Sequence, residues 1–290
     1  MSKNILFRAD SSSTIGLGHI MRDLVFAQRY KEYNITFACQ NLDGNINKKI
    51  KEAGFSLEIL KSNNPNELID LLLRLNINIL IIDHYGIDYK FEKIIKEKTQ
   101  VKLLVFDDTY EKHFCDEIIN HNISADASKY RTEEFTKVCI IPPLIRDEFK
   151  KITLRNTEVR TGNILICMGG VDSKNLTPSI ISILKNFKNI HIHVATSNIN
   201  KYIHELKSIS DITLHINTVN MAKLMNQSDL AIITPSVIVH EAMFMNLPFI
   251  AIKIASNQDD IYQYLQKHGF NVLEQFNEKY LLDYLEKELS

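Results

Sequence analysis

Residues 5–19 read Ile-Leu-Phe-Arg-Ala-Asp-Ser-Ser-Ser-Thr-Ile-Gly-Leu-Gly-His, and this stretch decides the fold class. An apolar run passes into a serine- and glycine-rich segment, which predicts a strand, a loop and then a helix that opens at about Gly18. The loop lets backbone N–H groups approach an anion, and the helix N-terminus adds partial positive charge. Met21 stands where a dinucleotide fingerprint has its third glycine, so the pattern does not favour a nicotinamide site.

Strand-like and helix-like segments alternate along the whole chain. The predicted strands are 5–8, 35–39, 56–60, 79–83 and 102–106 in the first half, and 164–168, 191–196, 213–216, 230–234 and 249–252 in the second. Predicted helices lie near 19–32, 45–53, 66–75 and 88–98, and then near 175–187, 200–208, 219–226, 236–245, 257–268 and 278–288. This alternation is typical of an α/β protein with parallel sheets covered by helices on both faces.

A break between the halves divides the chain. Pro142-Pro143 ends a strand, and the polar segment 146–161 follows, which predicts a linker. We therefore expect two Rossmann-like domains, residues 1–145 and 162–290, each with a parallel sheet. Open α/β sheets bind ligands beyond the carboxyl ends of their strands, so we expect the two sheets to face a ligand cleft.

Charge balance and cysteine usage exclude several classes of protein. The chain has 290 residues, 34 of them basic and 35 acidic, and its formal net charge of -1 gives no overall attraction for nucleic acid or anionic membrane. No apolar run approaches the ~20 residues of a membrane helix, and no signal peptide is evident. Four cysteines without metal-binding spacing are typical of a reduced, intracellular chain. We expect a cytoplasmic protein with no nucleic-acid or membrane partner.

His19 lies in the first turn of the first predicted helix. There the helix dipole disfavours the imidazolium form, and a neutral ring suits a general base near pH 7. A capping or packing histidine is the alternative. Asp10 stays open between orienting His19, binding a ligand and capping the serine-rich turn. His191 and His193 share one strand face, but no further ligand follows at a useful spacing, so we expect no metal and no cofactor.

The second half carries a loop of its own, in which Gly169-Gly170 follow a predicted strand and precede a helix that begins near Lys174. Adjacent glycines let the backbone approach a phosphate closely. The alternative is an ordinary strand-to-helix turn, in which Asp172 and Ser173 cap the helix.

The string R-x-D-S-S-x-x-I-G-x-G-H-x-x-R, from Arg8 to Arg22, resembles the start of one enzyme family. These enzymes are the UDP-2,4-diacetamido-2,4,6-trideoxy-β-L-altropyranose hydrolases of pseudaminic acid synthesis. The resemblance covers nearly the whole chain, since it continues at residues 81–86, 106–108, 167–176, 241–242 and 257–258. It implies the two-domain GT-B glycosyltransferase fold, and it makes the chain similar to the transferase that adds N-acetylglucosamine to peptidoglycan precursors.

The resemblance implies that water attacks the anomeric carbon of the UDP-sugar, with inversion, and that UDP leaves. His19 matches the catalytic base of the family. UDP is a good leaving group, so one base suffices where most glycosidases need a pair of carboxylates. Helix N-termini after Gly18 and after Gly169-Gly170 then stabilise the charge that develops on the diphosphate.

The resemblance also implies residues that bind the substrate. Glu241 matches the glutamate that accepts hydrogen bonds from the ribose hydroxyls, with a solvated helix residue as the alternative. Asn257 matches an asparagine at the sugar, or it caps a helix. Tyr85 stacks on the sugar, bonds its substituents, or lies at the edge of the core. The predicted binding residues are Asp10, Gly16, Gly18, Arg22, Tyr85, Gly169, Gly170, Ser236, Glu241, Asn257 and Gln258.

Some neighbours of these residues enter the same hypothesis. Asp83 and His84, directly before Tyr85, are secondary candidates for the site. Thr234-Pro235 stands where small serine- or alanine-like residues are expected beside the phosphate ligand Ser236, and His240 is interpreted as a packing residue.

Two other functions stay open at this point. A GT-B glycosyltransferase would use a UDP-amino-sugar donor and would need an acceptor. A nucleotide-sugar-binding protein would keep the fold without catalysis, and His19 argues against it. The stereochemistry of the sugar rests on the resemblance alone.

Overall fold

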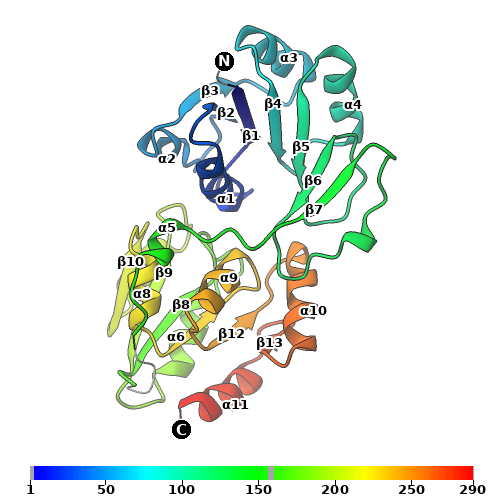
Figure 1. The fold of residues 1–290 in the computed structure, drawn as a ribbon. Helices are drawn as coiled ribbons and strands as arrows, with labels where there is room; N and C mark the ends of the chain where they lie inside the picture. The colour runs from blue at the N-terminus through cyan, green and yellow to red at the C-terminus, as the bar shows by residue number, and fades with distance from the viewer. Residues whose placement is uncertain (1–2, 156–159, 290) are drawn as a thin grey trace. The chain divides into compact units, whose positions relative to one another are not determined.

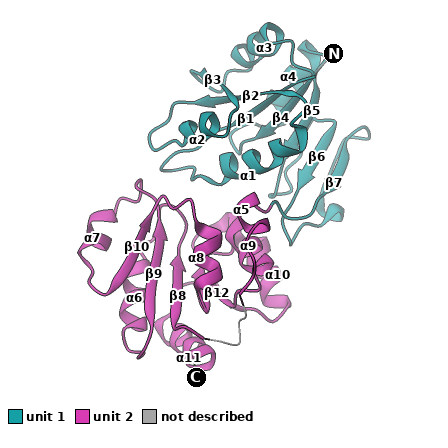
Figure 2. Cartoon of the chain, turned by 60° about the vertical axis from the view of Figure 1, so that its left-hand side comes forward, with its two compact units in different colours: residues 1–144 teal, residues 145–290 magenta. Residues whose placement is uncertain are grey.

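The computed structural model describes residues 3–155 and 160–289 (Figure 1). The chain forms two compact units, Met1–Leu144 and Ile145–Ser290 (Figure 2). Each unit is built around one parallel β-sheet with helices, which confirms the fold class that the alternating segments predict. The segment 146–161, predicted as a linker, groups with the second unit, and the short helix α5 (Asp147–Lys150) forms within it.

The sheet of the first unit has seven strands in the order β3-β2-β1-β4-β5-β6-β7, and the pairings are parallel. The chain runs outward from β1 to β3 on one side and from β4 to β7 on the other. The strand order therefore reverses between β1 and β4, and such a reversal is where open α/β sheets bind their ligands. The strands are β1 (Asn4–Ala9), β2 (Asn34–Gln40), β3 (Ser56–Leu60), β4 (Ile79–Asp83), β5 (Lys102–Phe106), β6 (Glu117–Asn120) and β7 (Lys137–Ile140).

Capping side chains fix where two helices of the first unit begin. In front of α3 (Pro65–Arg74), the Asn64 side chain accepts a hydrogen bond from a backbone N–H of the first turn. In front of α4 (Tyr89–Lys98), Asp88 does the same. The other helices of this unit are α1 (Gly18–Ala27), α2 (Asn47–Glu52) and the 3-10 helices η1 (Gln28–Tyr30) and η2 (Ala127–Lys129).

Two apolar layers enclose the sheet of the first unit. One layer contains Leu6 of β1 and the inner faces of α3 and α4. The other contains Ile5, Phe7 and the Phe26 side chain of α1. Successive residues of β1 therefore face opposite layers, which is why an uninterrupted apolar run forms this central strand.

The second unit has a six-stranded parallel sheet in the order β10-β9-β8-β11-β12-β13, with its reversal between β8 and β11. Its core includes Ile164, Ile232 and Leu281, which are completely buried. The strands are β8 (Asn163–Cys167), β9 (His191–Thr196), β10 (Ile212–Ile216), β11 (Leu230–Ile233), β12 (Phe249–Ile252) and β13 (Asn271–Leu273). The helices are α6 (Thr177–Leu184), α7 (Ile203–Ser208), α8 (Met221–Gln227), α9 (Val237–Phe244), η3 (Ser256–Gln258), α10 (Asp259–Lys267) and α11 (Glu278–Leu289).

Candidate active site

The loop that follows β1 is closed by its own backbone. The Ser12 N–H donates to Gly16 O, and the Gly16 N–H donates to Ser12 O. Ser12 Oγ accepts from the N–H groups of Thr14 and Ile15. Gly16 has a φ of +89°, a left-handed conformation that favours glycine. Gly18 is the first residue of α1, as the sequence predicts.

His19 is fixed by a carboxylate from the neighbouring strand. Its Nδ1 lies 2.6 Å from Asp83 Oδ1, and both side chains are almost completely buried. An ionised carboxylate can only accept, so the ring proton sits on Nδ1 and the lone pair stays on Nε2. This is the tautomer that a general base needs. Ala9 and Asp83 are in register between β1 and β4, which explains how residues so far apart in sequence meet.

Arg22, one turn further along α1, holds the same carboxylate. Its Nε and Nη2 each lie 2.5 Å from an oxygen of Asp83, and its Nη1 lies 2.9 Å from Asp108 Oδ2. Burial opposes ionisation of Asp83, but Arg22 and His19 hold its pKa well below the usual range by charge and hydrogen bonding. Arg22 Nη2 also lies 3.2 Å from His19 Nδ1, a contact without a hydrogen bond because both atoms carry protons.

Tyr85 completes this group of side chains. Its ring stands edge-on to the His19 ring, with centroids 4.7 Å apart and an angle of 77° between the planes. Its hydroxyl donates to Asp108 Oδ1 over 2.8 Å, and burial together with the Asp108 charge raises the pKa of Tyr85. We call His19, Arg22, Asp83, Tyr85 and Asp108 the His19 cluster. Its members form a closed ring of contacts at the reversal between β1 and β4.

Asp10 lies outside this ring. Its side chain is completely buried and accepts from both Nη atoms of Arg8, from the Gln40 N–H and from His84 Nε2. Asp83, named only as a secondary candidate by the sequence, is therefore the residue that orients His19. The binding role of Asp10 stays a prediction.

In the second unit, Gly169 and Gly170 follow β8. Gly169 has a φ of +79°, and an added Cβ would meet no atom of the described chain within 4 Å. Backbone conformation, and not crowding, therefore requires glycine there. Gly170 O accepts from the N–H and the hydroxyl of Ser197, which anchors the loop to the end of β9.

The helix after this loop begins later than the sequence predicts. α6 starts at Thr177, whereas the expected start was near Lys174. Asp172 accepts from the N–H groups of Leu176 and Thr177 and so caps the helix, which the sequence raised as the alternative. These two N–H groups are therefore used within the protein.

Glu241 on α9 is buried, so the interpretation as a solvated residue is wrong. Arg146 binds both of its carboxylate oxygens, with Nε 2.6 Å from Oε1 and Nη2 2.8 Å from Oε2, and its Nη1 lies 2.7 Å from Glu148 Oε1. Burial raises the pKa of Glu241 although the charge and hydrogen bonds of Arg146 oppose that rise. Each oxygen keeps a second lone pair, so the carboxylate can still accept from a pair of hydroxyls.

Three other predicted residues follow β11 and β12. Ser236 precedes α9, and its Oγ lies 3.0 Å from Thr234 Oγ1. Asn257 is exposed on η3, and within the described chain no side chain caps α10, so capping by Asn257 is not observed. The buried Gln258 accepts from the Ile254 N–H over 2.9 Å, which ties its side chain to its own loop.

Two further features lie apart from these residues. In the described part of the chain, no group of three or more His, Cys, Asp or Glu side chains has a metal-binding arrangement. His193 contacts His215, and their ring nitrogens are 3.1 Å apart.

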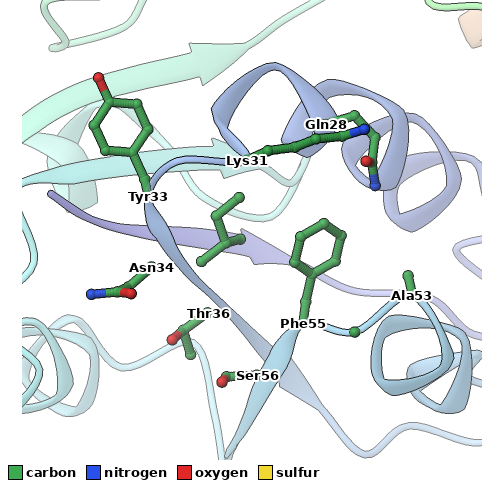
Figure 3. A pocket seen from close by; sticks show the side chains of 10 residues that line it. Gln28, Lys31, Tyr33, Asn34, Thr36, Ala53, Phe55 and Ser56 are labelled. Atoms are coloured by element: carbon green, nitrogen blue, oxygen red, sulfur yellow. The ribbon is translucent and has the colours of Figure 1, made fainter. Parts of the chain in front are cut away.

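A pocket of about 430 Å³, lined by Lys31, Tyr33 and Phe55 among others, opens at the amino ends of β2 and β3 (Figure 3). It lies at the other end of the sheet from the His19 cluster.

The two units define a structural class. The crystal structure of Acinetobacter baumannii MurG matches with a TM-score of 0.65 and 13% identity, over 99% of this chain and 91% of that one. A glycosyltransferase of kitacinnamycin matches with a TM-score of 0.72 and 10% identity, over 100% and 91%. Anabaena HepE in complex with UDP and glucose matches with a TM-score of 0.62 and 14% identity, over 99% and 89%. The chain has the GT-B fold of such glycosyltransferases.

Sequence likeness places the chain within that class. It belongs to the family of UDP-2,4-diacetamido-2,4,6-trideoxy-β-L-altropyranose hydrolases. It is 41% identical over 275 residues to the Campylobacter jejuni hydrolase of that name, a match that covers 92% of this chain and 98% of that protein. An uncharacterised protein of Methanocaldococcus jannaschii is 29% identical over 296 residues, covering 94% of this chain and 60% of that protein. No family model matches the chain.

Proposed function

We propose that this chain hydrolyses UDP-2,4-diacetamido-2,4,6-trideoxy-β-L-altropyranose and releases UDP and the free sugar, with inversion at the anomeric carbon. One observation carries the proposal: Asp83 binds His19 through Nδ1 and leaves Nε2 with its lone pair. The kind of sugar comes from the related Campylobacter jejuni hydrolase, which supports the same substrate here.

The first unit supplies the base of this reaction. His19 Nε2 takes a proton from water while the water oxygen attacks the anomeric carbon. The bond from this carbon to the UDP oxygen breaks, and its electron pair leaves with UDP, so the single displacement inverts the centre. The imidazolium that forms faces the Asp83 carboxylate at 2.6 Å, and this fixed negative charge stabilises it. A positioned base of this kind contributes about 10²–10⁴-fold.

The second unit supplies the contacts to the nucleotide. Glu241 accepts from the ribose hydroxyls, and Arg146 keeps its carboxylate in place. The backbone N–H groups of residues 169–171 and the hydroxyl of Ser236 donate to the diphosphate, where negative charge develops as UDP leaves. The exposed amide of Asn257 binds the acetamido and hydroxyl groups of the sugar. The diphosphate is a stable leaving group, so the reaction proceeds without a metal ion.

The reaction belongs to the cytoplasm in this proposal. The cysteines of the described chain are free thiols, as in a reducing compartment. The balanced charge of the chain offers no basis for binding nucleic acid. Among the described residues, none of the helices has the length and hydropathy that a membrane span requires.

An NMR time course tests the proposal. The purified chain and this UDP-sugar are mixed in EDTA without an acceptor, and we expect UDP and the free sugar to appear together, with the α anomer first. His19→Ala should bind the UDP-sugar and leave it intact. Near-normal turnover by His19→Ala would contradict the mechanism. Substrate that stays intact with folded protein, and is consumed only after a glycan or lipid acceptor is added, would establish a glycosyltransferase instead.

A further inference from the structure

The first unit holds two His–Asp pairs that cross between the same two strands. His19 follows β1 and contacts Asp83 at the end of β4, whereas His84 follows β4 and contacts Asp10 just after β1. The proposed mechanism uses only the first pair. In the second pair Asp10 is buried and His84 is mostly buried, and the pair has an arginine of its own, Arg8.

His84 has both ring nitrogens committed to the protein. Its Nδ1 accepts from the Gly86 N–H over 2.8 Å, and a backbone N–H can only donate, so the ring proton sits on Nε2. This Nε2 lies 3.0 Å from Asp10 Oδ2, to which it donates. With both nitrogens used, His84 is neither an acid nor a base for a ligand. It links a buried carboxylate to the turn that follows β4.

Asp10 is a fixed anchor for this link. Arg8 donates to both of its oxygens, at 2.8 and 2.7 Å, and the Gln40 N–H donates at 2.6 Å. Arg8 is completely buried and also donates to Ala38 O over 3.2 Å and to Asn63 Oδ1. The anchor is therefore tied to the ends of β1 and β2 and to the segment before α3.

The turn leaves little room for a side chain at position 86 while the His84 ring is in place. A Cβ on Gly86 would lie 2.8 Å from Cε1 and 3.2 Å from Nδ1 of His84, which is closer than normal packing. Between the two lies Tyr85, which is 48% exposed. Its ring nevertheless stands against His19 and its hydroxyl bonds Asp108. Because nearly half of this side chain is exposed, its place depends on the backbone of the turn as well as on these two contacts.

We propose that His84 and Asp10 are positioning residues that lock the turn 84–86 and so hold Tyr85 against His19. The inference rests on the proposed function, in which the His19 ring that Tyr85 contacts is the base. Loss of the His84 side chain frees the Gly86 N–H and releases Tyr85 from its place. The packing of the His19 ring then suffers.

A double-mutant cycle between His84→Ala and Tyr85→Ala tests this role. We expect His84→Ala to lower kcat/KM about tenfold in the natural chain, but less than about twofold when Tyr85 is already alanine, because residues that act through one another do not add. Losses that add fully would overturn the proposal. His191→Ala, which removes an exposed histidine of the second unit, is the matched control and should change nothing.

Two variants separate positioning from proton transfer and from misfolding. His84→Gln offers an amide N–H to Asp10 and a carbonyl to the Gly86 N–H, so we expect it to recover most of kcat/KM with an unchanged pH profile. A glutamine variant as inactive as the alanine variant, with one limb of the profile lost, would make His84 an acid or base. If His84→Ala does not fold, Gly86→Ala displaces the same ring and should show the same dependence on Tyr85.

Amide exchange gives a measurement that needs no substrate. The Gly86 N–H loses its acceptor in His84→Ala, so we expect its exchange, followed by NMR, to speed up about tenfold or more. An unchanged rate would overturn the proposal. If the natural chain does not hydrolyse the UDP-sugar, the proposed function fails, while the exchange rate still decides whether His84 locks the turn.

Discussion

The carboxyl ends of the two sheets use their charged groups differently. At the reversal between β1 and β4, Arg22 lies between two carboxylates, and the His19 cluster offers a ligand mainly the His19 Nε2 and the Tyr85 side chain. At the reversal between β8 and β11, Gly169 has a left-handed backbone conformation, and the partly exposed Arg146 binds the buried Glu241. In the proposed mechanism, the first arrangement serves proton transfer and the second serves nucleotide binding. The comparison therefore predicts that changes in the first unit affect catalysis and that changes in the second unit affect UDP affinity.

Among changes in the two units, Asp83→Asn should have the largest effect on catalysis. The amide keeps the shape but loses the charge that selects the Nδ1–H tautomer of His19 and stabilises its imidazolium. We expect kcat to fall about 10³-fold while UDP affinity stays unchanged, because the loss is confined to the transition state. Steady-state kinetics and calorimetric titration with UDP measure the two quantities.

The control for this prediction is Asp108→Asn. Asp108 bonds Arg22 and Tyr85 and reaches His19 only through them. The kcat of this variant should fall about tenfold, since Asp108 acts on His19 only indirectly. Equal losses in the two variants would show that the whole cluster, and not the His19–Asp83 pair, carries the chemistry.

Arg146→Met tests the second unit in the same way. It leaves the buried Glu241 without its cation, and we expect the free energy of unfolding of this unit to fall by about 2 kcal/mol, less than for a completely buried pair because Arg146 is partly exposed. UDP affinity should fall about tenfold with kcat nearly unchanged. Urea unfolding and UDP titration measure these effects.

The double variant Arg146→Met with Glu241→Gln sharpens that result. Removing both charges should restore most of the stability, since no unpaired ion remains buried, but it should not restore UDP affinity. Full UDP affinity in either variant would mean that the ion pair only supports the fold.

Most of the fold is predictable from the sequence because its central strands are long apolar runs. The ten strands predicted from alternation are all present, and β3, β4, β5, β9 and β12 have the predicted bounds. β6 and β13 contain only two apolar residues each, too few to form a recognisable run, and β7 is indicated only by the proline pair that follows it. The start of α6 differs from the predicted start because the Asp172 side chain accepts a hydrogen bond from the first turn of this helix.

The loop and the helix start of the candidate site were predictable because their sequence pattern is local. His19, Gly16 and Gly18 share one short segment, and its residue types indicate a base beside an anion-binding loop. Asp83 and Arg146 act across 64 and 95 positions of sequence, and no spacing rule measures such a contact before the strand register is known. Asp10 shows the reverse, since it is near His19 in sequence but bonds His84.

Buried charge in the first unit also predicts a pH dependence of stability. His113 Nδ1 lies 2.7 Å from Glu92 Oε1, and its Nε2 lies 3.7 Å from Asp107 Oδ1. Burial opposes the charged form, but the Glu92 hydrogen bond and the charges of Glu92 and Asp107 raise the pKa of His113 from 6.5 to about 9. The folded state therefore binds this proton more tightly than the unfolded state.

The free energy of unfolding therefore falls as the pH rises. The stabilisation is complete below pH 6.5 and is lost as the pH rises to about 9. We expect the free energy of unfolding to fall by about 2 kcal/mol over this pH range. Full linkage, at about 1.4 kcal/mol for each unit of pKa shift, would give a somewhat larger fall. His113→Gln should flatten the profile in urea unfolding. In the second unit, burial lowers the pKa of His193 and of His215, so their effect appears instead as lost stability on acidification.

The smallest contrast lies within η3, between two adjacent amides. Asn257 is exposed, whereas Gln258 is buried and accepts from the Ile254 N–H. Asn257→Ala should raise KM about three- to tenfold and leave stability unchanged, because an exposed amide bonds only the ligand. Gln258→Ala should lower the free energy of unfolding by about 1 kcal/mol with little change in KM. A large rise in KM for Gln258→Ala and none for Asn257→Ala would contradict this assignment. The side chain bonded to its own loop would then be the one that binds the sugar.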